Sequence, residues 1–247
     1  MTPAETLRRL HQDRPRVLPN VWDAASARAY ADAGFPALAT SSGAVAASLG
    51  YEDHEQAPVE EVLGAVARIV RAVEVPVTAD FEAGYGLSPT ETVDRLLAVG
   101  AAGANLEDTD HAARALRPVE VQAEWLGAVV GHAAGRLVVN ARVDTYLSGT
   151  GEDEDAVARA RAYLGVGVDC TYPIGFLDEA TTGRLVEAFP GPVNVLSYPD
   201  GPTLARLGAL GVARITFGGF LFRAAMDRTA RAADRLRSDA LAGGRTP

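Results

Sequence analysis

The chain has 247 residues, 48% of them hydrophobic, with a formal net charge of −9 and a sequence pI near 5.0. This length favours one α/β barrel domain spanning residues 1–247, because single barrels of about 200 to 250 residues are common. The acidic balance argues against nucleic acid or an anionic membrane as a partner. One cysteine, Cys170, excludes a disulfide framework and a cysteine metal cluster. The polar N-terminus and the lack of a long apolar run predict a cytoplasmic protein.

The sequence contains no lysine, so its 23 basic residues other than histidine are all arginine. Schiff-base aldolases and pyridoxal phosphate enzymes need a lysine amine, and so does the Walker phosphate loop. These three kinds of chemistry are therefore excluded. If the protein stabilises an enolate, a metal ion remains as the means of doing so.

Short apolar runs alternate along the chain with amphipathic segments rich in Ala, Leu, Val and Arg. The predicted strands are Arg16–Pro19, Pro36–Thr40, Val75–Asp80, Gly103–Glu107, Leu137–Arg142, Val168–Pro173, Pro192–Ser197 and Arg214–Gly218. The predicted helices are Ala24–Ala33, Pro58–Ala72, Ser88–Val99, Val119–Ala134, Glu152–Leu164, Leu177–Ala188, Thr203–Leu210 and Phe220–Ala240. Eight strand and helix units predict a parallel sheet closed into a (β/α)8 barrel of the TIM type. An open doubly wound sheet is the alternative, but no Gly-x-Gly-x-x-Gly follows the first strand.

Polar residues follow the predicted strands, where a barrel enzyme carries its active site. The third strand runs into Asp80 and Glu82, and residues two apart in a strand point to the same side. Two carboxylates with substrate oxygens and waters suffice for Mg²⁺ or Mn²⁺. Other strand ends carry Ser42–Ala44, Glu107 and Arg142, a set that suits a metal-chelated 2-oxo carboxylate held by the arginine and by backbone N–H groups.

Several motifs resemble those of the isocitrate lyase and phosphoenolpyruvate mutase superfamily, from Leu18 to about Ala225. The motifs that carry the resemblance are Pro19–Asp23, Ser42–Gly43, Thr78–Gly86, Asn105–Asp108 and Asn140–Asp144. The resemblance implies an Mg²⁺-dependent enzyme that makes or breaks a bond next to a 2-oxo acid through an enolate. Each motif alone is weak, whereas the five together are quite specific.

The resemblance also implies a role for each matching residue. Asp80 is similar to the main metal ligand, and Glu82 and Glu107 to residues that hold metal-bound waters. The amides of Ser42, Gly43 and Ala44 match the oxyanion-binding groups, Arg142 matches the substrate clamp, and Asp53 matches the acid of a mobile gating loop. For Asp53, a solvated loop acid is an equally good interpretation of the sequence.

Where the sequence departs from the superfamily motifs, it argues against some of the superfamily's reactions. The isocitrate lyases carry a cysteine as general acid after the fourth strand, whereas this chain has Thr109–Arg114 there, and Cys170 is expected to be a buried strand residue. The phosphonate enzymes have Lys and Asn in this loop and His after the sixth strand, where Ala113, Ala115 and Ile174 stand here. His111 could donate a proton, although an exposed loop histidine is the plainer interpretation. Trp22 is a candidate pocket wall or core residue.

The leading hypothesis is therefore an Mg²⁺-dependent lyase or decarboxylase that cleaves a carbon–carbon bond in a 2-oxo acid such as oxaloacetate. A phosphonate or carboxyphosphonate mutase or hydrolase is one alternative, and a binding protein for 2-oxo acids or oxalate is another. For the last helix, Phe220–Ala240, the plain interpretation is a charged, solvent-facing helix packed on its own barrel, and the sequence does not decide between this and exchange. The resemblance instead implies a homotetramer that exchanges this helix, with a dimer as a further possibility.

Overall fold

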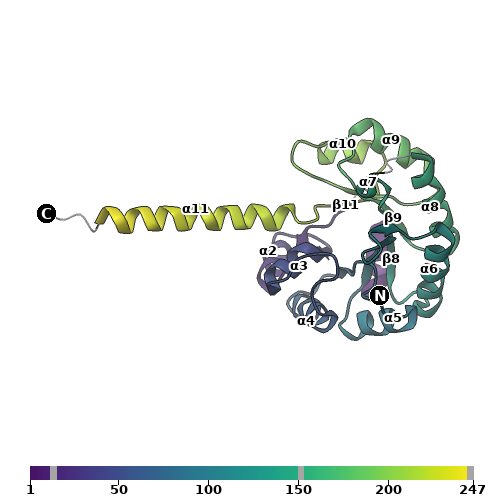
Figure 1. The fold of residues 1–247 in the computed structure, drawn as a ribbon, viewed down its shortest axis with the longest axis horizontal. Helices are drawn as coiled ribbons and strands as arrows, with labels where there is room; N and C mark the ends of the chain where they lie inside the picture. Colours follow the sequence, from purple (N-terminus) through teal and green to yellow (C-terminus); the bar gives the residue numbers. More distant parts are fainter. Residues whose placement is uncertain (12–15, 150–152, 244–247) are drawn as a thin grey trace.

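The computed structural model describes residues 1–11, 16–149 and 153–243 and forms a single (β/α)8 barrel (Figure 1). The strands are β1 (Arg16–Val17), β2 (Asn20–Val21), β3 (Leu38–Thr40), β4 (Val77–Asp80), β5 (Gly103–Leu106), β6 (Thr109–Asp110), β7 (Ala115–Leu116), β8 (Val138–Val143), β9 (Cys170–Pro173), β10 (Asn194–Leu196) and β11 (Arg214–Thr216). The helices are α1 (Pro3–Leu10), α2 (Ala24–Asp32), α3 (Ser42–Leu49), α4 (Val59–Val70), α5 (Pro89–Ala98), α6 (Val119–Ala133), α7 (Thr145–Ser148), α8 (Asp153–Gly165), α9 (Glu179–Ala188), α10 (Leu204–Ala209) and α11 (Phe220–Gly243).

The barrel strands are parallel and follow the chain order expected for repeated strand and helix units. One ladder runs β2-β3-β4-β5-β8-β9 and a second runs β1-β11-β10. The two ladders meet at two places: a parallel bridge joins Thr171 to Val193, and residues 16–21 supply β1 to one ladder and β2 to the other. The carboxyl ends of all these strands therefore point to the same end of the molecule.

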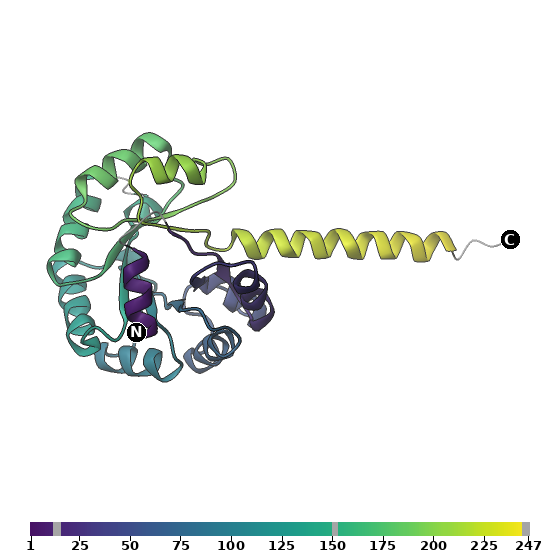
Figure 2. The same cartoon turned by 180° about the vertical axis from the view of Figure 1, so that it is seen from behind.

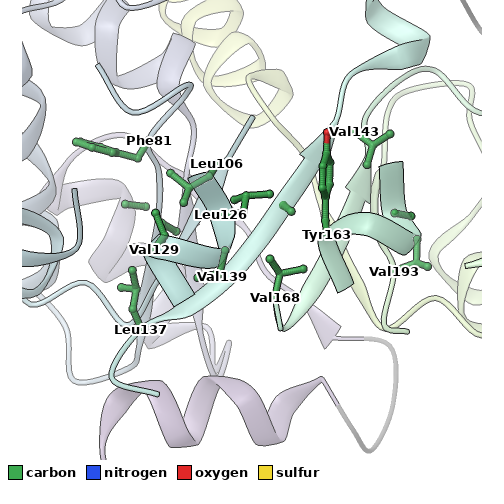
Figure 3. Packing of buried hydrophobic residues seen from close by; sticks show 14 of the residues in the cluster. Phe81, Leu106, Leu126, Val129, Leu137, Val139, Val143, Tyr163, Val168 and Val193 are labelled. Carbon is green, nitrogen blue, oxygen red and sulfur yellow. The ribbon is translucent and has the colours of Figure 1, made fainter. Parts of the chain in front are cut away.

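Alternation along the strands separates an apolar outer face from a polar inner one. In β8, Val139, Ala141 and Val143 belong to the main hydrophobic cluster, whereas Asn140 and Arg142 bond to other polar side chains inside the barrel. Figure 3 shows the cluster between the strands and the surrounding helices, with Leu126 and Tyr163 packed against β8. Burial of this apolar area stabilises the wall of the barrel.

Helix α1 closes the amino-terminal end of the barrel (Figure 2). Thr2 caps it in a reciprocal capping box with Glu5, and Pro3 takes a first-turn position where its missing N–H costs nothing. Leu7 is fully buried against the beginnings of the strands, in a cluster with Leu18 and Val138. Access to the interior is therefore from the opposite end.

Helix α11 differs from the other helices because it projects away from the barrel (Figure 1). Only its first residues touch the body: Phe222 packs edge to face on Trp22 with ring centroids 5.3 Å apart, and Phe220 lies near Phe176. Farther along, Met226 is 42% exposed and Leu236 is 71% exposed. Of the alternatives that the sequence left open for this helix, packing along its own barrel is therefore not found in the described residues.

The eight predicted strands and their helices are confirmed, with small shifts at their ends. The first strand is divided into β1 and β2 because it pairs with β11 and then with β3. The helix predicted from Glu152 begins at Asp153, and residue 152 lies outside the described part of the chain. Helices α1, α3 and α7 and the β6-β7 hairpin were not predicted, since short elements carry too little periodicity. No described helix has the length and apolarity needed to span a membrane.

Candidate active site

The loops after the strands enclose a cavity of about 640 Å³ at the open end of the barrel. Its lining carries many charged side chains and comes from four places: the loop before α4, the β6-β7 hairpin, the end of β8 and α7. The lining residues are Glu52, Asp53, His54, Gln56, Thr109, His111, Arg114, Ala115, Leu116, Arg142, Asp144, Leu147 and Ser148. Charged groups of both signs therefore face the same space.

Helix α3 presents its amino terminus to this site. Ser41 caps the helix, and the Ser42 N–H donates to Asp80 Oδ2 at 3.1 Å. Asp53 lies directly over Gly43, because a Cβ built on that glycine would be 2.7 Å from Asp53 Oδ2. The first N–H groups of a helix have no intrahelical acceptor and attract anions. Ser42, Gly43 and Ala44 are thus placed where an oxyanion could bind.

Asp80 and Glu82 reach the site differently from the sequence prediction. Strand β4 ends at Asp80, and Glu82 has a left-handed backbone with φ 46°, so strand alternation does not extend to it. Asp80 is deeply placed, and burial raises its pKa. Burial, together with nearby Asp53 and Glu107, raises the pKa of Glu82 to about 8. The two carboxylates converge through a tight turn, and the argument from a shared strand face is wrong.

Reciprocal hydrogen bonds tie the Asp53 loop to this turn. The Glu55 N–H donates to Glu82 Oε2 at 2.7 Å, and the Tyr85 N–H donates to Glu55 Oε1 at 2.6 Å. The Tyr85 hydroxyl also donates to Glu82. His54 and Glu55 have left-handed φ values of 68° and 59°, a strained conformation that these bonds hold in place. The loop in this structure is closed over α3.

Arg142 is the centre of the charge network on the cavity side. It forms two 3.0 Å hydrogen bonds with Asp144, from Nε to Oδ1 and from Nη2 to Oδ2, and a close ion pair with Glu107. Burial opposes its charge, but Asp144 and Glu107 more than compensate and raise the pKa of Arg142. Its fork of donors suits a carboxylate.

His111 lies on the β6-β7 hairpin, beside the acids. Its Nε2 contacts Glu107 Oε1 and is 3.9 Å from Glu82 Oε2. Its hydrogen bond with Glu107 raises the pKa of His111, so the imidazolium is favoured. The ring is also near His54, with centroids 5.1 Å apart. His111 is therefore held in the site and is not a freely solvated loop residue.

Asp108, the neighbour of Glu107, turns away from the cavity. Its Oδ2 accepts from Arg159 Nη1 at 3.0 Å and from the Tyr163 hydroxyl at 2.7 Å, while its Oδ1 accepts from the Asp144 N–H at 3.0 Å. Both Arg159 and Tyr163 belong to α8. This buried network joins the end of β5 to the outer helix layer.

The acids of the site fit a divalent cation. Asp53, Asp80, Glu82 and Glu107 repel one another, as their contributions to the raised pKa values of Glu82 and Asp80 show. Asp53 Oδ1 is buried and has no hydrogen-bond partner among the described residues. Hard oxygen donors of this kind suit Mg²⁺ or Mn²⁺. Separately, His54, Glu82 and His111 each offer one ligand atom, all within 4.8 Å of one another.

Most of the predicted site residues come together at this end of the barrel. Of these, Asp53, His111 and Arg142 line the cavity, and Glu82 and Glu107 lie beside His111. Trp22 instead packs on Phe222 of α11. The sequence analysis missed Asp144, Glu55 and His54. Their signals were weak: Asp144 stands two residues after Arg142 at a strand end, and the other two follow the gating acid. Cys170 is fully buried, as expected, and burial raises the pKa of its thiol to about 12.

Fold and site together define a (β/α)8-barrel enzyme whose open end suits a small anionic substrate beside a divalent cation. The chain belongs to the phosphoenolpyruvate phosphomutase family, whose model matches residues 7–237, and so to the phosphoenolpyruvate mutase and isocitrate lyase superfamily. This finding confirms the resemblance drawn from the motifs.

Known relatives carry more than one activity. Oxaloacetate decarboxylase from Chromohalobacter salexigens is 31% identical, over 85% of this chain and 76% of its own length. A Burkholderia cenocepacia structure provisionally assigned as a phosphonomutase is 40% identical, with a TM-score of 0.88 over 94% of this chain and 99% of that one. Oxaloacetate acetylhydrolase with bound oxalate is 27% identical, with a TM-score of 0.89 over 100% of this chain and 91% of that one.

Proposed function

We propose that the protein is a metal-dependent lyase that cleaves a carbon–carbon bond next to the 2-oxo group of a small dicarboxylic acid, with oxaloacetate as the leading candidate. The observation that carries the proposal is the cluster of acids at the open end of the barrel. Asp53 and Arg142 line the cavity, Glu107 pairs with Arg142, and Asp80 accepts from the amino terminus of α3, over which Asp53 lies. The likeness to oxaloacetate decarboxylases and to oxaloacetate acetylhydrolase supports the choice of substrate.

Three parts of the chain would each contact a different part of the substrate. The backbone N–H of Gly43 at the start of α3 would hold one anionic oxygen. The flanking Ser42 and Ala44 N–H groups donate at present to Asp80 Oδ2 and Ser41 Oγ and would turn to the substrate only by exchanging these acceptors. Arg142 would hold a carboxylate, exchanging part of its present contact with Asp144 or Glu107 for the substrate. Asp53, on the closed loop, would cover the reacting atoms and exclude water.

Asp80, Glu82 and Glu107 would hold the cation, Asp80 directly and the two glutamates through waters. Mg²⁺ or Mn²⁺ bound there would polarise the 2-oxo group and stabilise the negative charge that develops as the adjacent bond breaks. The oxygen donors favour these two ions, and we propose Mg²⁺ as the physiological one.

The carbon left by bond cleavage must then receive a proton. His111 is the candidate donor, because it lies beside the acids of the site and its hydrogen bond with Glu107 raises the pKa of its imidazole. Glu107 would then contact both the proton donor His111 and the substrate-binding Arg142.

The direct test is proton NMR of oxaloacetate with the protein and Mg²⁺, beside an Asp80→Ala variant. With the wild-type protein, oxaloacetate should disappear faster than it does with Mg²⁺ alone, and pyruvate should form. The variant should give no such increase. Equal rates in the two proteins would contradict the proposal. If the wild-type protein binds oxaloacetate or oxalate in the presence of Mg²⁺ but converts neither, a binding protein would instead be favoured.

A phosphonate or carboxyphosphonate substrate is the second candidate, favoured by the 40% identity to the Burkholderia cenocepacia protein. The same cation site and helix terminus would serve a phosphoryl group. Phosphorus NMR with phosphonopyruvate distinguishes the two candidates, since only a phosphonate enzyme converts its resonance.

We further propose a homo-oligomer, a tetramer or a dimer, in which α11 packs on a neighbouring subunit. The support is the exposed apolar side chains Met226 and Leu236 on a helix that leaves its own barrel. Light scattering after gel filtration should give a multiple of 25.8 kDa, and a monomer would contradict the exchange. We also retain the cytoplasm as the proposed location, to be tested by cell fractionation.

A further inference from the structure

Arg214, in β11, is the largest of the fully buried side chains and lies inside the barrel beneath the candidate active site. None of the ion pairs among the described residues includes it. Its Nε and Nη1 have no hydrogen-bond partner in the described part of the chain. A buried cation without an acid at contact distance is costly, so packing alone does not account for this residue.

Among the described residues, the Arg214 side chain makes one hydrogen bond, and it runs toward the site. Its Nη2 donates to Asn105 Oδ1 at 3.2 Å, and Asn140 Nδ2 donates to the same oxygen at 2.8 Å. The other end of the Asn105 amide, Nδ2, lies 3.5 Å from Asp80 Oδ1. A chain of polar groups thus leads from Arg214 through Asn105 to the carboxylate at the end of β4.

Arg214 determines the direction of the hydrogen bonds in this series of polar groups. An asparagine amide can turn its oxygen or its nitrogen toward a neighbour, and Asn105 and Asn140 could in principle reverse together. A guanidinium has only donors and stays protonated, so the atom of Asn105 that faces it must be the oxygen. The N–H donor of Asn105 is therefore directed at Asp80, which also accepts from the Ser42 N–H at 3.1 Å.

We propose that Arg214 is a positioning residue for the cation site, acting through Asn105 to hold Asp80 in the rotamer that binds the metal. This inference rests on the proposed role of Asp80 in the function above. Partners behind a metal ligand typically change metal affinity about 10- to 100-fold when they are removed.

The experiment measures Mn²⁺ binding without substrate, by electron paramagnetic resonance of free Mn²⁺. Arg214→Met is expected to weaken Mn²⁺ binding about 10- to 100-fold without lowering the thermal unfolding midpoint, because a lone buried charge is removed. A purely structural arginine would instead lower the midpoint. Arg214→Lys keeps the charge and donors and should lose less affinity than Arg214→Met.

Two further variants keep the inference testable if Arg214→Met does not fold. Asn105→Leu should weaken Mn²⁺ binding to the same extent, and combining it with Arg214→Met should add little, since both act on one path. Arg16→Met is the matched control, because Arg16 is the register partner of Arg214 on β1, whereas the side chain of Asn105 bonds to Arg214, Asn140 and Asp80.

The outcomes separate this inference from the proposed function. Wild-type Mn²⁺ affinity in Arg214→Met or in Asn105→Leu would overturn the positioning role. If the wild-type protein itself binds no Mn²⁺, or binds it equally after Asp80→Ala, the proposed cation site is wrong. An equal loss in Arg16→Met would show a nonspecific effect of removing an arginine and would also overturn the inference.

Discussion

Glu107 and Asp108 are adjacent in the chain, equally buried and both acidic, yet they face two different regions of the molecule. Glu107 contacts Arg142 and His111 on the cavity side. The Asp108 carboxylate is instead held by Arg159 and Tyr163 of α8, and it also accepts from the backbone N–H of Asp144. In each case burial raises the pKa of the carboxyl, so titration alone would not tell them apart.

The difference lies in how charge is balanced. On the cavity side, Asp53, Asp80, Glu82 and Glu107 share Arg142 and His111, and Asp53 Oδ1 lacks a partner among the described residues. On the helix side, every oxygen of Asp108 has at least one donor. An acid-rich region with unmet acceptors can bind a cation, whereas a satisfied network fixes one element to another.

The largest effect should come from Glu107→Gln. This change keeps the shape but removes the charge that supports Arg142 and His111, so kcat/KM for oxaloacetate should fall about 100- to 1000-fold. The free energy of unfolding should change little, because Arg142 keeps its two hydrogen bonds with Asp144 and stays compensated. Steady-state kinetics and urea unfolding check both parts. Near-normal kcat/KM would place Glu107 with the structural acids.

Asp108→Asn should lower stability and leave the kinetics nearly unchanged, the opposite of Glu107→Gln. Breaking a buried pair leaves Arg159 poorly compensated and should lower the free energy of unfolding by about 3 kcal/mol. In the protein that remains folded, kcat and KM should change by less than roughly threefold. A large loss of kcat at unchanged stability would show that the two acids are not separated as described.

The pH dependence of stability offers a third test, made on the metal-free protein in EDTA. Because the pKa of Glu82 is raised from 4.5 to about 8 in the folded state, the folded protein binds more protons than the unfolded one between these values. Stability is then greatest below pH 4.5 and decreases as pH rises toward 8. The loss between pH 5.5 and 7 should be about 2 kcal/mol. Glu82→Gln should flatten this slope; an unchanged slope would assign it to other groups.

Gly43→Ala should produce the smallest of these effects. The new methyl group would lie 2.7 Å from Asp53 Oδ2 and displace that side chain from α3, so kcat should fall about tenfold. Gly64→Ala is the matched control, since its nearest neighbour is the Arg68 side chain at 3.8 Å. That change should leave kcat unaltered and stabilise α4 slightly. Equal kinetics in the two variants would argue against a role for the Asp53 loop.

The sequence predicts the barrel well because each unit repeats the same two periodicities, and it locates the site because polar residues collect at strand ends. It cannot distinguish Glu107 from Asp108, since strand alternation has ended where they stand and only the turn geometry orients them. The left-handed backbone of Glu82 and the α3 cap at Ser41 likewise depend on tertiary context. Arg214 was predicted only as a strand residue, because nothing local indicates that a charged side chain points inward.

The absence of lysine has a practical consequence for chemical labelling. No side chain of the sequence offers a primary amine, and the single thiol, Cys170, is fully buried. Reagents directed at lysine or at accessible cysteine should therefore leave the side chains of the folded protein unmodified. A cysteine introduced on an exposed helix would then carry a probe at one chosen side-chain position.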